Sequence, residues 1–235
     1  MRFSPLGDRA LLIHVGSTID EATHRRVRAI ASRLRALAPP GVIDIVPAFT
    51  SVAVHYDPLV VPGASGPDAH GAYERFAASV HAVLHGLGEE HLPPPRMVEV
   101  PVCYGGVHGP DLDAVADLHG MSAAEVVQLH EAGDYLVYML GFAPGFAYLG
   151  GLSPRIVTPR RGQPRTMVPA GSVGIGGGQT GVYPLASPGG WQLIGRTPLH
   201  LFDAARTPPA LLALGDRVRF RGIALEEFNS LASGG

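Results

Sequence analysis

Residues 166–195, TMVPAGSVGIGGGQTGVYPLASPGGWQLIG, limit the possible fold of this chain more than any other segment. These thirty residues include no Asp, Glu, Lys, Arg or His, whereas nine are glycine and three are proline. In a helix interior, glycine costs about 1 kcal/mol and proline about 3 kcal/mol relative to alanine, so this stretch cannot be helical. It predicts short strands joined by tight turns, as at the rim of a β-barrel or sandwich.

The sequence on either side of this stretch predicts further elements of the same domain. Residues 97–102 predict a strand, and residues 111–120 and 122–133 predict two short helices. The first helix ends at Gly120, and Ser122 with Glu125 forms a capping box at the start of the second. Residues 216–221 alternate charged and apolar side chains, which predicts a final strand at an exposed sheet edge.

The first 90 residues follow a different pattern, in which strands and helices alternate. Two short strands are predicted within residues 3–15, and a hairpin within residues 42–56. An amphipathic helix follows a predicted capping box of Thr18 and Glu21, and a second helix is predicted at about residues 69–87. The β-β-α-β-β-α order predicts an antiparallel sheet with both helices on one face.

Residues 86–95, GLGEEHLPPP, are predicted to link two domains because the segment is polar, begins with glycine and ends in three prolines. We therefore expect an α+β domain over residues 1–90 and a β-barrel or β-sandwich domain over residues 91–235. A chain of 235 residues, of which 46% are hydrophobic, can bury a core in each domain.

Charge and targeting signals exclude several classes of partner. The formal net charge of −2 and the absence of a basic stripe argue against nucleic acid and anionic membranes. The single cysteine, Cys103, excludes an internal disulfide and cysteine-based metal sites.

No signal peptide is visible, and the uncharged run between Asp134 and Arg155 is interrupted by glycine and proline, unlike a membrane helix. These features predict a cytoplasmic protein.

The glycine-rich turn at residues 176–181, GGGQTG, matches the glycine spacing of a dinucleotide-binding loop. The required helix does not follow, because Val182, Tyr183 and Pro184 come next, so this chain alone does not predict a nucleotide site. The amides of Gly176, Gly177 and Gly178 can still bind an anion or carbonyl oxygen, assisted by Gln179 and Thr180. An equally weighted alternative is a tight strand connection with nothing bound.

Aromatic and arginine residues surround the same stretch. Phe142, Phe146 and Tyr148 lie in GFAPGFAYLGG, and Trp191 is the only tryptophan; they predict a hydrophobic binding surface or a small core beneath a loop. Five arginines follow in an otherwise nearly uncharged region: Arg155, Arg160, Arg161, Arg165 and Arg196. Guanidinium groups suit carboxylates and phosphates, which favours a pocket for an acidic substrate, although a solvated loop is the commoner outcome.

Metal and nucleophile signals are weak. His81 and His85 are four residues apart on a predicted helix, but no HExxH motif accompanies them and we predict no metal site. There is no GxSxG motif, and Cys103 lies inside a predicted strand.

Four motifs together carry a family resemblance. They are LGDRALL (residues 6–12), CYGGVHGPDLDAVA (103–116), YMLGFAPGFAYLGGL (138–152) and PRRGQPRTMVPAGSVGIGGGQTGVYPLASPGGWQLIGRTPLHLFD (159–203). The chain resembles the family called allophanate hydrolase subunit 1, or kinase A inhibitor-like, whose bacterial members are mostly similar to the B subunit of 5-oxoprolinase. It departs from the family pattern at Val107 and His108, where an acidic and an aromatic residue are expected, and at Ala147, where proline is expected.

The resemblance implies a small N-terminal α/β domain followed by a cyclophilin-like barrel. It also implies two partners, the homologous C subunit and the A subunit of 5-oxoprolinase, which together with this chain cleave 5-oxoproline to glutamate with ATP. Members that resemble the kinase inhibitor bind a sporulation histidine kinase instead, and related domains occur within urea carboxylase. Prolyl isomerisation, by analogy with cyclophilins, ranks last because fold alone does not imply activity.

Within such a complex we expect this chain to contribute part of a shared site. Gln179 and Arg196 are the predicted catalytic residues, with Arg165 or Arg196 holding a carboxylate. The predicted substrate-binding residues are Phe142, Phe146, Tyr148, Arg165, Gly176, Gly177, Gly178, Thr180 and Trp191. ATP is expected at the level of the complex.

Overall fold

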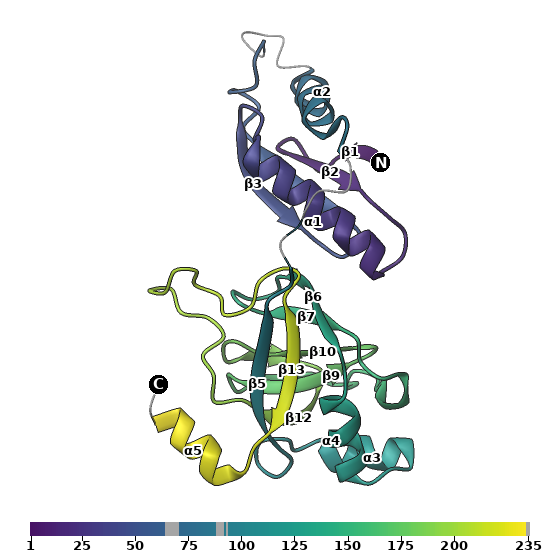
Figure 1. Ribbon diagram of the computed structural model, residues 1–235, viewed down its shortest axis with the longest axis vertical. Helices are drawn as coiled ribbons and strands as arrows, with labels where there is room; N and C mark the ends of the chain where they lie inside the picture. Colours follow the sequence, from purple (N-terminus) through teal and green to yellow (C-terminus); the bar gives the residue numbers. More distant parts are fainter. Residues whose placement is uncertain (64–70, 88–91, 93, 234–235) are drawn as a thin grey trace. The chain divides into compact units, whose positions relative to one another are not determined.

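The computed structural model describes residues 1–63, 71–87, 92 and 94–233, and it divides into two compact units, Met1–Pro94 and Pro95–Gly235 (Figure 1). Half of the predicted linker, residues 88–91 and 93, lies outside the described residues, as does the predicted start of the second helix at residue 69.

The N-terminal unit is a four-stranded antiparallel sheet covered by two helices. The strands are β1 (Arg2–Pro5), β2 (Ala10–His14), β3 (Val42–Pro47) and β4 (Ser51–Tyr56), in the spatial order β1-β2-β4-β3. The helices are α1 (Glu21–Ala36) and α2 (Ala72–Leu84), and Figure 1 shows α1 lying across the sheet.

One core holds this unit together. Alternate residues of β4, namely Val52, Val54 and Tyr56, are buried because successive side chains of a strand point to opposite faces. They share a single hydrophobic cluster with Ile30 of α1 and Phe76 of α2, whose ring stacks on Tyr56 at 4.1 Å between centroids. Both helices therefore cover the same face, and the predicted antiparallel sheet with two helices is confirmed.

The start of α1 differs from the prediction. Asp20 is the N-cap, and its carboxylate accepts a hydrogen bond from the Thr23 amide at 2.7 Å. The Thr18 hydroxyl donates to the same carboxylate at 2.6 Å. The predicted capping box of Thr18 and Glu21 is therefore wrong, because an aspartate two residues closer to the helix caps it and Thr18 only orients that aspartate.

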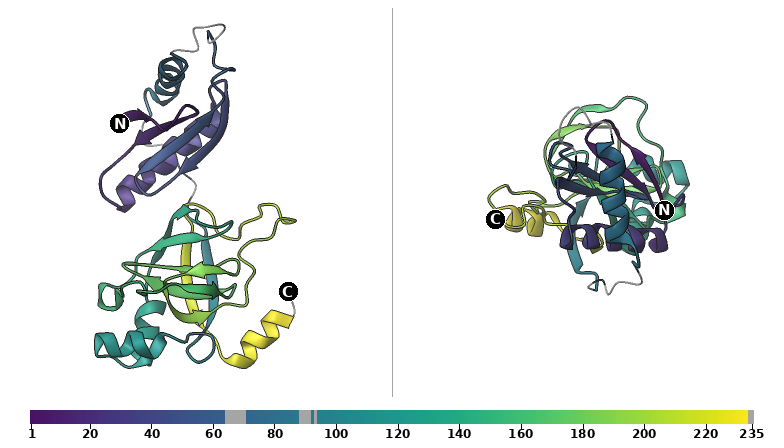
Figure 2. Two further views of the ribbon diagram at one scale, coloured as in Figure 1. Left: turned by 180° about the vertical axis from the view of Figure 1, so that it is seen from behind. Right: turned by 90° about the horizontal axis from the view of Figure 1, so that it is seen from above.

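The C-terminal unit is a closed barrel with the strand order β10-β7-β6-β13-β5-β12-β9 (Figures 1 and 2). Its strands are β5 (Met97–Tyr104), β6 (Tyr135–Leu140), β7 (Ala147–Gly150), β9 (Ser172–Gly176), β10 (Gln179–Val182), β12 (Gln192–Arg196) and β13 (Arg217–Gly222). A separate two-stranded sheet pairs β8 (Arg165–Val168) with β11 (Ser187–Gly189). The glycine-rich stretch thus forms short strands and tight turns as predicted, and the predicted fold class, an α+β unit followed by a β-barrel, is confirmed.

Strand β13 does not lie at a sheet edge. It pairs parallel with β5 and antiparallel with β6 inside the closed barrel. Val218 and Phe220 point into the core, whereas Arg219 and Arg221 face solvent. The prediction of a strand at an exposed sheet edge is wrong. A strand in a barrel wall shows the same alternation as an edge strand, because one of its faces is buried and the other is exposed to solvent.

Short helices complete the C-terminal unit. They are α3 (Leu112–His119), α4 (Ala123–Glu131), the 3-10 helix η2 (Pro154–Ile156) and α5 (Leu225–Ser233). The predicted capping box of Ser122 and Glu125 is present at α4, and Gly120 ends α3 in the left-handed conformation. Helix α5 was not predicted; its Phe228 packs on His108 at 4.4 Å between ring centroids. In the parts of the chain described here, every helix is too short or too polar to cross a membrane.

Candidate binding site on the barrel surface

Five aromatic side chains gather on the outer face of the barrel, and we call them the aromatic surface: Phe142, Phe146, Tyr148, Tyr183 and Trp191. Phe146, Tyr183 and Trp191 are buried and form a small core of their own, whereas Phe142 is exposed and Tyr148 is half-buried. The ring of Phe146 is central, with centroid distances of 4.9 Å to Tyr148, 5.4 Å to Tyr183 and 5.6 Å to Trp191. The rings meet edge-to-face or at a tilt, as quadrupole interactions favour. Phe142, Phe146, Tyr148 and Trp191, all predicted for substrate binding, are therefore brought together.

Glycines in β9 and β10 make room for Trp191. A Cβ at Gly176 would lie 2.5 Å from the indole Nε1, and a Cβ at Gly181 would lie 3.2 Å from indole Cζ3. The missing side chains let the indole lie flat on the strands. The amide of Gly177 is already used, because it donates to the Thr158 carbonyl at 2.8 Å. Gly176 and Gly177 thus have structural roles that differ from the predicted amide site, whereas Gly178 is exposed.

Gln179 and Thr180 are neighbours on β10 but face opposite sides of the sheet. Gln179 pairs with Gly176 and lies two residues before Gly181, so its side chain is on the face that carries Trp191. Thr180 is fully buried inside the barrel, where its hydroxyl donates to the Gly174 carbonyl at 2.9 Å. The structure therefore adds Gln179 to the site, but Thr180 is a core residue and its predicted role in substrate binding is not supported.

Asp111 organises two of the arginines. Its Oδ1 atom accepts hydrogen bonds from Arg165 Nη2 at 2.7 Å and from Arg161 Nη1 at 3.1 Å. Its Oδ2 atom accepts the Leu193 amide at 2.6 Å, which ties the carboxylate to β12. Asp111 is buried and occupies the N-cap position of α3, yet its side chain makes no capping bond.

Sequence reasoning missed Asp111. One signal was available, because no Asp or Glu occurs between Asp134 and Asp203, so the five arginines there need a carboxylate from elsewhere in the chain. Spacing could not identify which one, since Asp111 and Arg165 are 54 residues apart.

The arginines leave positive charge beside the aromatic surface. Arg161 and Arg165 share the single carboxylate of Asp111, so one guanidinium charge is not compensated by that residue. The guanidinium carbon of Arg160 lies 5.9 Å from the Trp191 ring centroid, in cation–π range. Arg165 pairs with Gly189 across the two-stranded sheet, and the hydroxyl of Tyr183 lies against the same glycine.

Phe142 has an unusual backbone. Its φ angle is 70°, the only positive φ among the non-glycine residues that the structure describes, and its side chain is 64% exposed. The left-handed region costs a non-glycine residue about 1 kcal/mol or more. Strain of this kind, on an exposed aromatic ring, is typical of binding sites.

This strain gives a test on paired variants. Phe142→Gly and Phe142→Ala both remove the ring, but only glycine relieves the positive φ, so Phe142→Gly should be the more stable by about 1 kcal/mol. Urea unfolding followed by Trp191 fluorescence reports on this unit alone, because Trp191 is the only tryptophan. Equal stability of the two variants would contradict the strained backbone.

Arg196 lies away from this group. Arg196 pairs with Ser172 and Gln179 with Gly176, four residues apart on β9, which separates them by roughly 13 Å along the strand. The Arg196 Nε atom donates to the Ala170 carbonyl at 2.8 Å. The structure therefore does not bring the two predicted catalytic residues together.

A buried histidine, which the sequence did not single out, lies behind the surface. His130 is fully buried, its Nδ1 lies 2.8 Å from the Tyr104 hydroxyl, and its Nε2 lies 2.9 Å from the Thr180 hydroxyl. Because Thr180 donates to Gly174, it accepts from His130, so Nε2 carries the proton and Nδ1 accepts from Tyr104. Burial lowers the pKa of His130 to about 3, and burial also raises the pKa of Tyr104.

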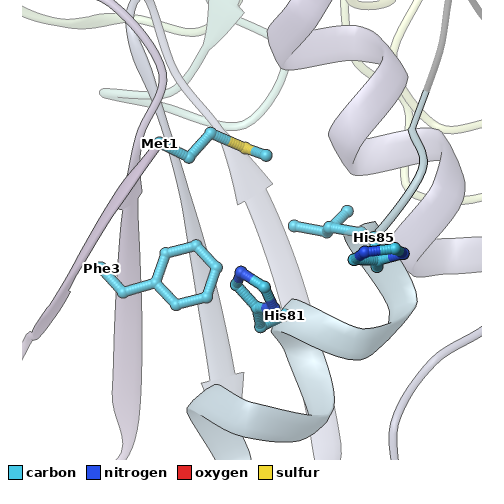
Figure 3. Close-up of a pocket in the computed structure, with 5 residues that line it drawn as sticks. Met1, Phe3, His81 and His85 are labelled. Carbon is cyan, nitrogen blue, oxygen red and sulfur yellow. The ribbon is translucent and has the colours of Figure 1, made fainter.

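The N-terminal unit has a pocket of about 400 Å³ lined by Met1, Phe3, His81, Leu84 and His85 (Figure 3). His81 packs edge-on against Phe3, with 6.1 Å between ring centroids. Among the described residues, no group of three or more His, Cys, Asp or Glu side chains is arranged to hold a metal ion.

The fold and the site define an α+β unit followed by a closed barrel whose outer face carries aromatic and arginine side chains. Residues 1–212 match the family described as carboxyltransferase domain, subdomain C and D, and the chain belongs to that family.

Relatives agree with the resemblance drawn from the motifs. The chain is 46% identical over 230 residues to the 5-oxoprolinase B subunit of Bacillus subtilis (strain 168), covering 96% of this chain and 94% of the relative. It is 45% identical over 215 residues to the 5-oxoprolinase B subunit of Escherichia coli O157:H7, covering 92% and 93%. The crystal structure of TTHA0988 superposes with a TM-score of 0.78 at 39% identity, covering 92% of this chain but only 40% of that chain.

Proposed function

We propose that this chain is the B subunit of an ATP-dependent 5-oxoprolinase, which opens 5-oxo-L-proline to L-glutamate. One observation carries the proposal: the 46% identity to the Bacillus subtilis protein of that name extends over 96% of this chain and 94% of the relative, and so includes both units. The Escherichia coli relative carries the same name at similar identity and coverage.

We further propose that the chain acts only with partner proteins, namely the homologous C subunit and the A subunit of the same enzyme. The names of the relatives describe one component of a larger enzyme. In TTHA0988 the match covers 40% of the chain, so in that protein this fold is joined to additional sequence in one polypeptide. A segment that is fused to this fold in one relative supports a separate partner protein for this chain.

ATP is assigned in this proposal to the assembled complex. The glycine-rich turn does not fit a phosphate site, because β10 follows it instead of a helix and the Gly177 amide donates to Thr158. No other residue of this chain is proposed to hold the nucleotide.

The chemistry explains why several subunits are needed. A lactam carbonyl is stabilised by resonance and is a poor electrophile, and phosphorylation of the amide oxygen by ATP would make attack by water feasible. In this proposal the chain binds and orients the ring of the substrate on the aromatic surface. The amide of Gln179, on the same face as Trp191, is proposed to donate to the lactam oxygen.

The test is ATP-dependent release of glutamate from 5-oxo-L-proline. Three mixtures are compared: this chain alone, the candidate A and C subunits without it, and all three proteins together, each with and without ATP. We expect activity only in the full mixture with ATP. If folded and associated proteins release no glutamate in any mixture, the assignment fails, and another amide, such as allophanate, or a histidine kinase partner becomes the leading hypothesis.

A further inference from the structure

We propose that Arg165, beside the aromatic surface, binds the carboxylate of a small ring-containing acid whose ring lies against the solvent-exposed part of that surface. The inference deepens the proposed function, which supplies 5-oxo-L-proline as the acid to test. The site itself rests on four features of the described residues: a net positive charge, a donor without a partner, a fixed guanidinium and an adjacent aromatic cluster.

The charge at this place is positive and local. Asp111 is the carboxylate that Arg161 and Arg165 share, and the chain contains no acidic residue between Asp134 and Asp203. Arg160 adds a further positive charge over the Trp191 ring. A region with more guanidinium than carboxylate groups attracts an anion.

Arg165 has a free, buried donor. Its Nη2 atom is used by Asp111, but its Nη1 atom is buried and has no hydrogen-bond partner. Buried donors in folded proteins are nearly always satisfied, so this guanidinium nitrogen is able to bind a further acceptor. A carboxylate oxygen is the acceptor that a guanidinium group binds most strongly.

The guanidinium is also held in place before any ligand arrives. Asp111 is tied to β12 through the Leu193 amide, and Arg165 is tied to Asp111. The side chain therefore loses little conformational freedom on binding, which favours affinity for a small ligand.

An aromatic cluster adjoins the donor. Arg165 pairs with Gly189, against which the Tyr183 hydroxyl lies, and the Tyr183 and Trp191 rings are 6.3 Å apart. Burial raises the pKa of Tyr183, whereas a hydrogen bond with the Trp191 backbone and the charges of Arg160 and Arg165 act in the opposite direction. Tyr183 and Trp191 are buried, and the rings of Phe142 and Tyr148, which reach solvent, pack against them. An anion that contacts Arg165 can thus place an attached ring against these two exposed members of the aromatic surface.

The experiment uses the fluorescence of Trp191, which is the only tryptophan. The intact chain is titrated with 5-oxo-L-proline, with pyrrole-2-carboxylate, with 2-pyrrolidinone, which lacks the carboxylate, and with inorganic phosphate, which lacks the ring. We expect a saturable response to the two acids, and binding at least about tenfold weaker for 2-pyrrolidinone and for phosphate. Equal affinity for 5-oxo-L-proline and 2-pyrrolidinone, or no saturable response to either acid, would overturn the site in the isolated chain.

Two variants separate binding from folding. Arg165→Gln removes the charge, whereas Arg165→Lys keeps a charge for Asp111 but lacks the second planar nitrogen, and both should weaken binding of the acids about tenfold or more. Arg219→Gln, on the exposed face of β13, is the matched control and should bind as the parent does. The thermal unfolding temperature of each variant shows whether a loss of binding is caused by misfolding. If Arg165→Gln does not fold, the binding affinity of Arg165→Lys is compared with that of the parent instead.

The same variants in the complete mixture of subunits distinguish this inference from the proposed function. If the complex releases glutamate, Arg165→Lys should raise the KM for 5-oxo-L-proline about tenfold with a smaller effect on kcat. An active complex whose KM is unchanged by Arg165→Lys refutes the site and leaves the proposed function intact. An inactive complex, with acid binding to the chain that depends on Arg165, refutes the proposed function and leaves the site intact.

Discussion

Asp111→Asn is expected to lower the free energy of unfolding of the barrel unit by about 3 kcal/mol. The carboxylate accepts from two arginines at Oδ1 and from the Leu193 amide at Oδ2. An asparagine amide group can replace only one of these acceptors, so its NH₂ group must face either the Leu193 N–H or the arginines. Removing one partner of a buried ion pair costs about 3–5 kcal/mol, and the lower end applies because Arg161 and Arg165 are partly exposed.

Urea unfolding followed by Trp191 fluorescence measures this loss. Asp113→Asn is the matched control, because Asp113 is an exposed aspartate in the first turn of α3 and its substitution should cost less than about 1 kcal/mol. Equal effects of the two substitutions would mean that Asp111 stabilises the unit only as an acidic residue near a helix start, and that the links to Arg165 and Leu193 contribute nothing.

The second large effect is on the pH dependence of stability. His130 has a folded-state pKa of about 3, whereas an unfolded histidine has its ordinary value of 6.5. The unfolded state therefore binds the proton more readily. The contribution of His130 to stability is complete above pH 6.5 and is lost as the pH falls towards 3, by up to about 1.4 kcal/mol per pH unit.

The groups around His130 do not compensate for its protonation. Tyr104 donates to Nδ1, and the rings of Tyr135 and Phe220 lie 5.4 Å and 4.5 Å away between centroids. A proton on Nδ1 would face the Tyr104 donor, and burial raises the pKa of both tyrosines, so neither supplies a negative charge.

The measurement is the free energy of unfolding between pH 7.5 and pH 4.5 for the parent and for His130→Gln. The parent should lose about 2–3 kcal/mol more than the variant over this range. Imidazole nitrogen chemical shifts check the same point without a substitution, because His130 should show no titration in the folded protein above pH 4.5. A midpoint near 6.5 would contradict the buried neutral histidine.

Several elements could be predicted because the cause is local. Glycine and proline at residues 166–195 exclude a helix wherever the stretch lies, and five strands form between Arg165 and Arg196. Ser122 and Glu125 satisfy each other across one helical turn, so the capping box needs no other part of the chain. Such features depend only on neighbours within a few residues.

Other features could not be predicted where the deciding neighbour is remote or where two local signals compete. Alternation in residues 216–221 indicates one buried face, but whether β5 and β6 flank the strand depends on barrel closure. Thr180 and Gln179 are adjacent in sequence, and the register of β10 against β9 sends one into the core and the other to the aromatic surface. At α1, Asp20 outcompetes Thr18 for the cap.

Residue types and their order are enough to define most element types, the two-part order of the chain, and the concentration of aromatic and arginine residues between residues 142 and 196. Which of those residues meet depends on the three-dimensional fold. Asp111 reaches Arg165 across 54 residues and His130 reaches Thr180 across 50 residues, through strand register and closure of the barrel. Composition and spacing do not encode those pairings directly, because they arise when strands far apart in the chain pack around one core and bury polar groups that must then find partners.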